Sequence, residues 1–266
     1  MTRRIYLVSE GVHDVTFFAR ILRKRFDASQ VRKAEQLDDG YRAWLASFKW
    51  PHGEDITRLS VPAPEFYVCP ARGVTIALVN ALGIDNIAKK LLVDREAFAT
   101  RSVDLHALGV VLDSDERTAA DSFNGMCEVL RRLELAVPGA LGEFVAGSPS
   151  TGIFVLPDGQ RAGTLEDVLV PLGRHVYGGL FAVAEPFIAG MRQVLDDIGG
   201  DERKELLKPS GAKKALLSAV SAVLKPGRAI QATLQDHRWI SRDTLEHPAV
   251  VPSVQFLERL FAAASA

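Results

Sequence analysis

Apolar runs and segments of helical periodicity alternate along the first two thirds of the chain. The apolar runs have the length and composition of buried strands, and they fall at residues 5–8, 65–70, 105–113 and 151–157. The segment after the first run places Val15, Phe18 and Leu22 on one helical face. This alternation predicts an α/β protein with a mostly parallel, four-stranded sheet that helices cover on both faces.

Helical spacing predicts the elements between and after these strands. In the first two thirds we expect helices near residues 41–48, 73–83 and 121–135. Further helices are expected at 163–172, 178–198, 211–224 and 252–263. The change in pattern predicts an α/β catalytic domain at residues 1–175 and a helical C-terminal extension at 176–266 that packs on it. Residues 27–65 are too irregular to assign in full.

Composition places the chain among globular proteins and limits what it can bind. The 266 residues suffice for one large domain or two small ones, and 47% of them are hydrophobic and 24% charged, which argues against disorder. The formal net charge is −1. A basic field over the whole protein is therefore absent, and any contact with nucleic acid must use a local patch.

Cysteine usage and the N-terminus predict a cytoplasmic protein. Cys69 and Cys127 are the two cysteines, and no CxxC pair exists that would indicate a zinc site or a disulfide framework. The apolar run after the first arginines is too short for a signal peptide. No segment approaches the roughly 18 apolar residues that a membrane span requires, so we expect no membrane association.

Two carboxylates end the third predicted strand, in the segment "GVVLDSDERT". Residues i and i+2 of a strand share a face, so Asp113 and Asp115 should project together, roughly 6.5 Å apart, with Ser114 pointing away and contributing least. Like charges that close repel each other unless a cation lies between them, and oxygen ligands favour Mg²⁺ or Mn²⁺. The alternative is a helix N-cap, which for an isolated DxD is the more common role.

Acidic residues also follow two other predicted strands. Glu10 comes just after the first strand and Asp14 falls in the first turn of the next helix, while Glu166 and Asp167 follow the fourth strand. Each pair alone is also typical of turn or first-turn helix acids. The carboxyl ends of parallel strands meet at one edge of a sheet, where ligands collect in open α/β folds, so these acids are expected to converge.

The motifs together resemble those of the Toprim domain, which topoisomerases, primases and OLD-family nucleases share. The resemblance rests on "YLVSEGVHDVTFF" and on "GVVLDSD" about a hundred residues later. The small Toprim-related proteins of the DUF3226 family are more similar still, because they share the segments "GIFVLPDG…GTLEDVL" and "KKALLSAVSAVLKPGRAIQATL". The resemblance covers most of the chain outside residues 27–65, and it implies a Toprim-like fold.

The resemblance also implies roles for individual residues. Glu10 matches the Toprim glutamate, a metal ligand or general acid/base, and Asp113 and Asp115 match the metal-binding pair. By similarity to OLD-type nucleases, Asp14 and Glu166 would complete a site for two Mg²⁺ or Mn²⁺ ions. Lys213 or Lys214 would be the catalytic lysine, and the sequence does not distinguish these neighbours. Asp167 is a candidate for a supporting or helix-dipole acid.

A basic segment is the candidate nucleic-acid surface. Residues 201–228 hold seven basic and three acidic side chains in an otherwise neutral chain. Lys225 and Arg228, together with Arg72 in "CPARGVTIAL", are predicted to contact nucleic acid. A solvated helix face is the alternative for much of this segment.

These observations predict a metal-dependent phosphodiesterase, a nuclease that acts on DNA or RNA by a two-metal mechanism. The first alternative is a catalytically silent Toprim-like module that binds nucleic acid or works only with a partner. The second is a phosphatase of the haloacid dehalogenase type, which has the motif DxDx[TV]. The chain resembles this motif at Asp113 and Asp115, but its threonine, Thr118, comes one residue later than the motif requires. A homo-oligomer or a protein partner is also expected.

Overall fold

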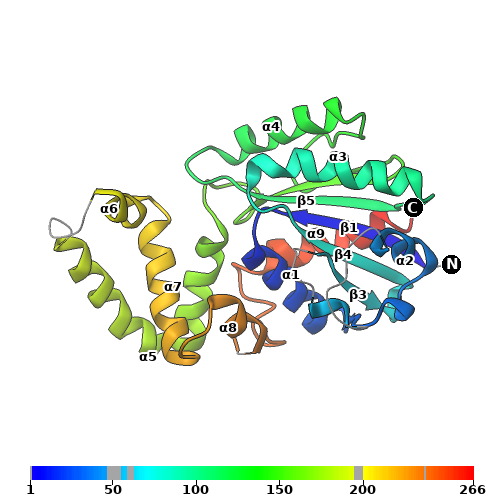
Figure 1. Ribbon diagram of the computed structural model, residues 1–266. Helices are drawn as coiled ribbons and strands as arrows, with labels where there is room; N and C mark the ends of the chain where they lie inside the picture. The colour runs from blue at the N-terminus through cyan, green and yellow to red at the C-terminus, as the bar shows by residue number, and fades with distance from the viewer. Residues whose placement is uncertain (1, 47–54, 59–62, 195–199, 237) are drawn as a thin grey trace.

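A seven-stranded sheet forms the centre of the computed structural model, which describes residues 2–46, 55–58, 63–194, 200–236 and 238–266 (Figure 1). The order of the strands is β2-β3-β4-β1-β5-β7-β6. Their bounds are β1 Arg3–Ser9, β2 Ser29–Gln30, β3 Glu65–Cys69, β4 Val74–Asn80, β5 Ala107–Asp113, β6 Phe144–Val145 and β7 Ser150–Leu156. The central strands β4, β1, β5 and β7 are parallel, whereas β2, β3 and β6 pair antiparallel at the edges.

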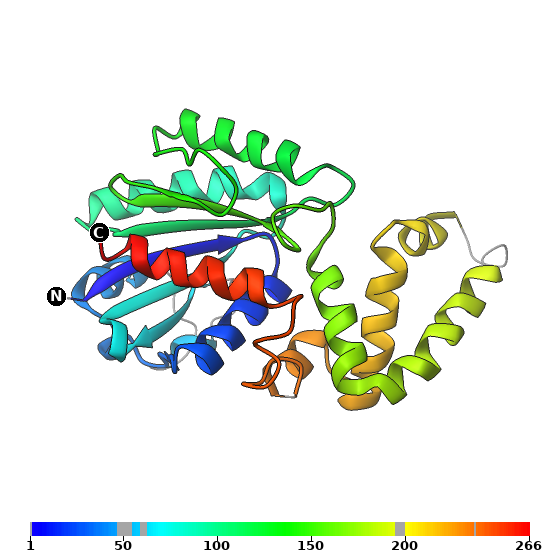
Figure 2. The ribbon, with the colours of Figure 1, turned by 180° about the vertical axis from the view of Figure 1, so that it is seen from behind.

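Helices cover both faces of this sheet. Their bounds are α1 Val12–Arg25, α2 Asp39–Leu45, α3 Ile84–Thr100, α4 Ala119–Arg132, α5 Leu165–Gln193, α6 Gly200–Leu207, α7 Gly211–Leu224, α8 Ile230–Asp236 and α9 Val251–Ala263. One apolar core holds α1, α9 and the start of α5 against one face, and a second core holds α2, α3 and α4 against the other. Figure 2 shows α9 lying across the sheet beside α1.

The prediction of four strands was wrong, although the mixed α/β class and the mostly parallel sheet are confirmed. Residues 73–83 were predicted as a helix, but Val74–Asn80 form β4, which pairs with β1 along its whole length. Its apolar residues are buried on both sides of the sheet, so the run has no alternation that would mark it as a strand. The predicted strand at 65–70 is β3, which is antiparallel to β4 and lies outside the parallel centre.

Several elements of the structure were not predicted from the sequence. They are the short edge strands β2 and β6 and the helices α3, α6 and α8. The predicted helix at 41–48 corresponds to α2, and its residues 47–48 lie outside the described residues. The predicted helices at 163–172 and 178–198 form one element, α5, of which residues 195–198 lie outside the described part.

The crossovers place a ligand crevice between β1 and β5. The chain leaves β1 into α1 on one face of the sheet and leaves β5 into α4 on the other. Adjacent parallel strands whose helices depart to opposite faces leave an opening at their carboxyl ends. Ser9 of β1 is level with Asn80 of β4 and Val111 of β5, so the ends of the three strands lie along one edge.

The long helix α5 carries the chain away from the sheet. Its first turns pack in the core under the sheet, and its backbone departs from helical geometry at Tyr177. The helix also packs against α7. Figure 1 shows α5, α6, α7 and α8 as a projecting group of helices, here called the helical arm (residues 165–236). The departure at Tyr177 lies near the predicted boundary at 175, but α9 returns to the sheet and belongs to the first core.

The bend of α5 is fixed by packing around Gly173. A Cβ atom at this position would lie 2.3 Å from the Phe181 ring and 2.6 Å from the Trp239 ring. Both aromatic side chains are buried, and Trp239 also packs edge-on against Tyr177. The arm is therefore held to the sheet by a close contact that only glycine permits. None of the described helices is long and apolar enough to cross a membrane.

We expect Gly173→Ala to lower the free energy of unfolding by about 1–3 kcal/mol, the usual cost of overpacking a core. Gly190→Ala is the matched control, because nothing lies within 4 Å of a Cβ at Gly190 in the same helix. Alanine should stabilise that helical position by about 0.5–1 kcal/mol. Urea denaturation of the two variants measures both effects, and a Gly173→Ala protein as stable as the wild type would contradict the packing described.

Candidate active site at the carboxyl ends of the strands

A cleft with a cavity of about 430 Å³ opens where β1 and β5 end. The sheet and the first turns of α1 and α5 supply its acidic lining, and α7 and α8 supply the opposite wall. The residues that line it are Glu10, Gly11, Val12, His13, Asp14, Asp113, Leu165, Glu166, Leu169, Lys214, Leu217, Ser218 and Ile230. Four of the five residues predicted as metal ligands thus line one cleft, whereas Asp115 does not.

Glu10 and Asp14 come from the junction of β1 and α1. Asp14 is buried, and one of its carboxylate oxygens accepts a hydrogen bond of 2.8 Å from the Gly11 backbone N–H at the start of α1. Oε2 of Glu10 is buried and has no hydrogen-bond partner among the described residues. An unpartnered buried carboxylate oxygen is costly, so this atom is available for a ligand that reaches the cleft.

The geometry of the DxD segment differs from the prediction. β5 ends at Asp113, and Asp115 has a φ of +50°, so the two carboxylates do not share a strand face as expected. Asp115 is exposed and lies outside the lining of the cleft, although its charge acts on Glu10 and Asp113. A left-handed aspartate is a strained conformation of the kind found at functional sites.

The capping alternative for the DxD segment does not apply to the helix that follows it. Thr118 is the N-cap of α4, and its side chain accepts a hydrogen bond from the Asp121 N–H. Asp113 instead accepts a hydrogen bond of 3.1 Å from the Leu165 N–H, in the first turn of α5. The carboxylate therefore joins the end of β5 to a helix that begins more than fifty residues later.

Ser114 lies outside the lining of the cleft, but it has a structural role that the sequence did not predict. Its side chain is buried, and Oγ accepts a hydrogen bond of 2.7 Å from the Gly163 N–H. The backbone N–H groups of Ser114 and Asp115 both donate to the Gly163 carbonyl, at 3.0 and 3.1 Å. These bonds, here called the Ser114–Gly163 clamp, hold the loop before α5 against the end of β5 and so bring Glu166 to the cleft.

Glu166 and Asp167 are neighbours in the first turn of α5, but one lines the cleft and the other caps the helix. Asp167 accepts a hydrogen bond from the Thr164 N–H and forms a capping box at the start of α5. Glu166 points into the protein, is buried, and accepts a hydrogen bond of 2.6 Å from the Thr164 hydroxyl. Glu166 is the acid that lines the cleft, and Asp167 is the helix-capping acid.

Burial and mutual repulsion raise the pKa of three carboxyl groups in the cleft. Burial, followed by the charges of Glu10 and Glu166, raises the pKa of Asp14 to about 7, against a hydrogen bond from Gly11. The pKa of Asp113 is raised well above its ordinary value, first by burial and then by Asp14 and Glu10. The pKa of Glu10 is also raised, by burial and by Asp115. A cation in the cleft would relieve this repulsion.

The structure distinguishes the two neighbouring lysines. Lys213 forms a salt bridge of 2.6 Å with Asp167 and lines a separate surface hollow. Lys214 lines the cleft, and its positive charge lowers the pKa of both Glu10 and Asp14. Lys214 forms no ion pair with any described residue. It is therefore the lysine that faces the carboxylates.

The remaining predicted nucleic-acid contacts do not gather at the cleft. Arg72 lies at the amino end of β4, the opposite edge of the sheet, and its guanidinium lies over the rings of Phe26 and Phe261. Lys225 is paired with Asp236, and Arg228 is exposed in the turn between α7 and α8, outside the lining of the cleft. The sequence could not show which of these basic side chains form ion pairs in the folded protein.

His13 lines the cleft together with Glu10 and Asp14, but the sequence did not predict it as a site residue. Burial lowers its pKa, while the charge of Glu166 opposes that change. Ser218 and Ile230 complete the wall that α7 and α8 present, and nothing in their local sequence marks them. Only the position of His13 just after Glu10 could have indicated its place.

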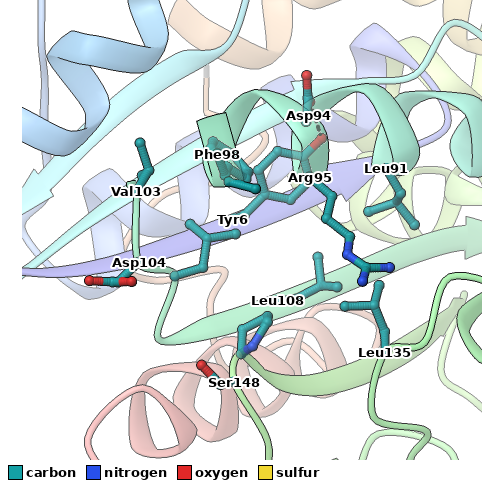
Figure 3. Close-up of a pocket in the computed structure, with 13 residues that line it drawn as sticks. Tyr6, Leu91, Asp94, Arg95, Phe98, Val103, Asp104, Leu108, Leu135 and Ser148 are labelled. Atoms are coloured by element: carbon teal, nitrogen blue, oxygen red, sulfur yellow. Dashed lines mark hydrogen bonds between the residues drawn. The ribbon is translucent and has the colours of Figure 1, made fainter. Parts of the chain in front are cut away.

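A second cavity, of about 200 Å³, lies near the opposite edge of the sheet (Figure 3). It is lined mainly by apolar residues such as Phe98, Leu108 and Leu135, from α3, β5 and the segment after α4. Its buried acid, Asp94, is satisfied by the Tyr6 hydroxyl and by Lys90. Because its buried acid is already paired, this cavity offers less chemistry than the acidic cleft.

The acidic cleft has the right ligands for a hard divalent ion but not a finished coordination site. Carboxylate oxygens are what Mg²⁺ and Mn²⁺ prefer, and the unpartnered oxygen of Glu10 fits such an ion. In the described residues, however, no group of three or more His, Cys, Asp or Glu side chains is placed so that it could hold a metal ion. Metal binding would require the carboxylates to turn toward one another.

Comparison with known proteins places the chain in a family. The family described as "Protein of unknown function (DUF3226)" matches residues 4–262. The chain belongs to the DUF3226 family. A solved structure, the hypothetical protein PH0156 from Pyrococcus horikoshii OT3, is similar over 100% of both chains, with 16% sequence identity and a TM-score of 0.57. This likeness shows a shared fold. No curated protein matches the chain.

We expect Ser114→Ala in this DUF3226 protein to lower the free energy of unfolding by about 1–3 kcal/mol, because the buried Gly163 N–H loses its acceptor. Urea denaturation measures the change. Ser218→Ala, at an exposed serine of α7, is the control and should stay within about 0.5 kcal/mol of the wild type. Equal stability of the two variants would show that the clamp does not hold the loop.

The raised pKa of Asp14 predicts how stability depends on pH without metal. Because the folded-state pKa, about 7, exceeds the ordinary value of 3.8, the folded protein holds the proton more tightly. The resulting stabilisation is full below about pH 4 and is lost as the pH rises through about 7.

In EDTA, the wild-type melting temperature should therefore decrease as the pH rises from about 5 to 8. The Asp14→Asn variant should show a flatter profile and melt several degrees higher than the wild type at pH 8, since about 1 kcal/mol corresponds to roughly 2–4 °C in a protein of this size. Glu128→Gln, at an exposed acid of α4, should keep the wild-type profile. An unchanged slope in Asp14→Asn would contradict the assigned pKa.

Proposed function

We propose that the protein is a phosphodiesterase that depends on Mg²⁺ or Mn²⁺ and cleaves nucleic acid, as the Toprim resemblance implies. The observation that carries the proposal is the meeting of four carboxylates from three strand–helix junctions in one cleft, opposite a lysine. Structural acids seldom gather in this way, because each raises the pKa of the others.

The residues that line the cleft would have different roles in this reaction. Glu10, Asp14, Asp113 and Glu166 would hold one or two divalent ions, and Asp115 lies close enough to add charge at the mouth. A bound ion would supply Lewis acidity toward a phosphoryl oxygen. Lys214 would stabilise negative charge that develops on the phosphoryl group. Glu10, with its unpartnered oxygen and raised pKa, is suited to accept or return a proton.

A silent binding module is the second candidate, and two observations favour it. The carboxylates are not placed to hold a metal as they stand in the described residues, and the net charge of −1 gives little general affinity for nucleic acid. A module of this kind would bind without turnover or would need a partner to complete the site.

The second half of α5 supports the expectation that another chain is bound, either a second copy or a different protein. Val183, Phe187, Met191 and Val194 are between 42% and 75% exposed. Their spacing of four, four and three residues places them along one face of the helix. An exposed apolar stripe of this kind is common at protein interfaces.

The metal requirement is tested first by cleavage. The protein is incubated with single- and double-stranded DNA and RNA in Mg²⁺, Mn²⁺ or EDTA, beside Asp113→Asn and Glu10→Gln. We expect cleavage with metal only, reduced about a hundredfold or more in both variants, because a metal ligand contributes several kcal/mol. Glu128→Gln, which alters an exposed acid outside the cleft, should cleave as the wild type does.

Metal binding is tested separately by thermal melting. Mn²⁺ should raise the melting temperature of the wild type by several degrees and leave Asp113→Asn unchanged, because binding to the folded state alone stabilises it. Binding of nucleic acid without cleavage would favour the silent module, and release of phosphate from small monoesters would favour a phosphatase. Cleavage that survives in both variants would overturn the site proposed.

A further inference from the structure

We propose that the cleft accepts one unpaired nucleotide, whose nucleoside lies against a wall formed by Val12, His13 and Ile230, and that the substrate is therefore single-stranded nucleic acid. This inference rests on the proposed function, since it concerns the substrate of the same site. We call these three residues the nucleoside wall. They come from the first turn of α1 and the start of α8.

The depth of the carboxylates requires the phosphate to enter the cleft. Asp14 is 5% exposed and Glu166 is 7% exposed, so a double helix lying on the protein surface cannot reach either carboxylate. The cavity of about 430 Å³ is of the size that holds small ligands. Enzymes that act in narrow pockets take single strands or extrude a nucleotide from the duplex, at an energetic cost.

The nucleoside wall offers a surface that suits a base. Val12 is 41% exposed, and His13 and Ile230 are half-buried, so all three present surface to the cleft. An imidazole and two branched aliphatic side chains provide a largely apolar surface, and bases of single strands stack on aromatic side chains that include histidine. Lys214 and Ser218 line the cleft from α7 and offer a cation and a hydroxyl to the phosphate and sugar.

The charge at the cleft argues against a continuous duplex. Lys214 is the single lysine or arginine among the described residues that line it. The neighbouring Lys213 and Lys225 are neutralised by Asp167 and Asp236. Proteins that bind duplex contact many phosphates and carry a clustered basic surface, and they lose affinity steeply with salt. A cleft with one cation fits a substrate that presents one or two phosphates.

The test compares a short single strand with a blunt duplex of the same sequence in Mn²⁺. We expect the single strand to be cleaved at least about tenfold faster. His13→Ala and Ile230→Ala should each raise KM for the single strand, His13→Ala by roughly tenfold, because stacking on an aromatic residue is lost. His13→Phe should restore KM, since phenylalanine keeps the ring. Val223→Ala, at an exposed valine of α7 outside the cleft, is the matched control and should not change KM.

The outcomes separate this inference from the proposed function. Equal cleavage of duplex and single strand, with metal dependence intact, overturns the inference and leaves the proposed function standing. An unchanged KM in both His13→Ala and Ile230→Ala, with circular dichroism showing that both are folded, overturns it as well. Absence of metal-dependent cleavage of every substrate overturns both.

Discussion

The Ser114–Gly163 clamp is the contact on which the arrangement of the cleft depends. Gly163 has a φ of +153°, and a Cβ there would lie 2.8 Å from a carboxylate oxygen of Asp167, so only glycine allows the loop to lie this close. The clamp places the first turn of α5 beside the end of β5, where Asp113 accepts a hydrogen bond from Leu165. Together with the burial of Leu165 and Val168 in the core, the clamp fixes the position of Glu166 relative to Glu10 and Asp14.

The N-termini of α1 and α5 stabilise the negative charges that gather in the cleft. Asp14 accepts a backbone hydrogen bond at the start of α1 and Asp113 accepts one at the start of α5, and the positive ends of both helix dipoles lie toward the carboxylates. These contacts offset part of the cost of burying the groups, but the raised pKa of each shows that they do not offset all of it. Residual repulsion of this kind is what makes such a cleft receptive to a cation.

The helical arm supplies the half of the cleft that the sheet lacks. Packing of Gly173 against Phe181 and Trp239 fixes the bend of α5, and α5 packs against α7. That pairing presents Lys214 to the carboxylates, while α8 contacts α1 and presents Ile230 beside His13. Lys214 therefore faces acids from distant parts of the chain, of which Glu10 and Asp14 lie about two hundred residues before it and Glu166 about fifty.

The sequence by itself determined the α/β class and the convergence of Glu10, Asp14, Asp113 and Glu166, because buried strands and the acids that end them are local patterns, and the carboxyl ends of parallel strands share one edge. It could not show that residues 74–80 are a strand, since a run buried on both faces has no periodicity. Only the tertiary structure decided which lysine faces the acids, that Ser114 anchors the loop before α5, and that Arg72 lies at the other edge of the sheet. Each of these depends on contacts between residues far apart in the chain, which local spacing does not encode.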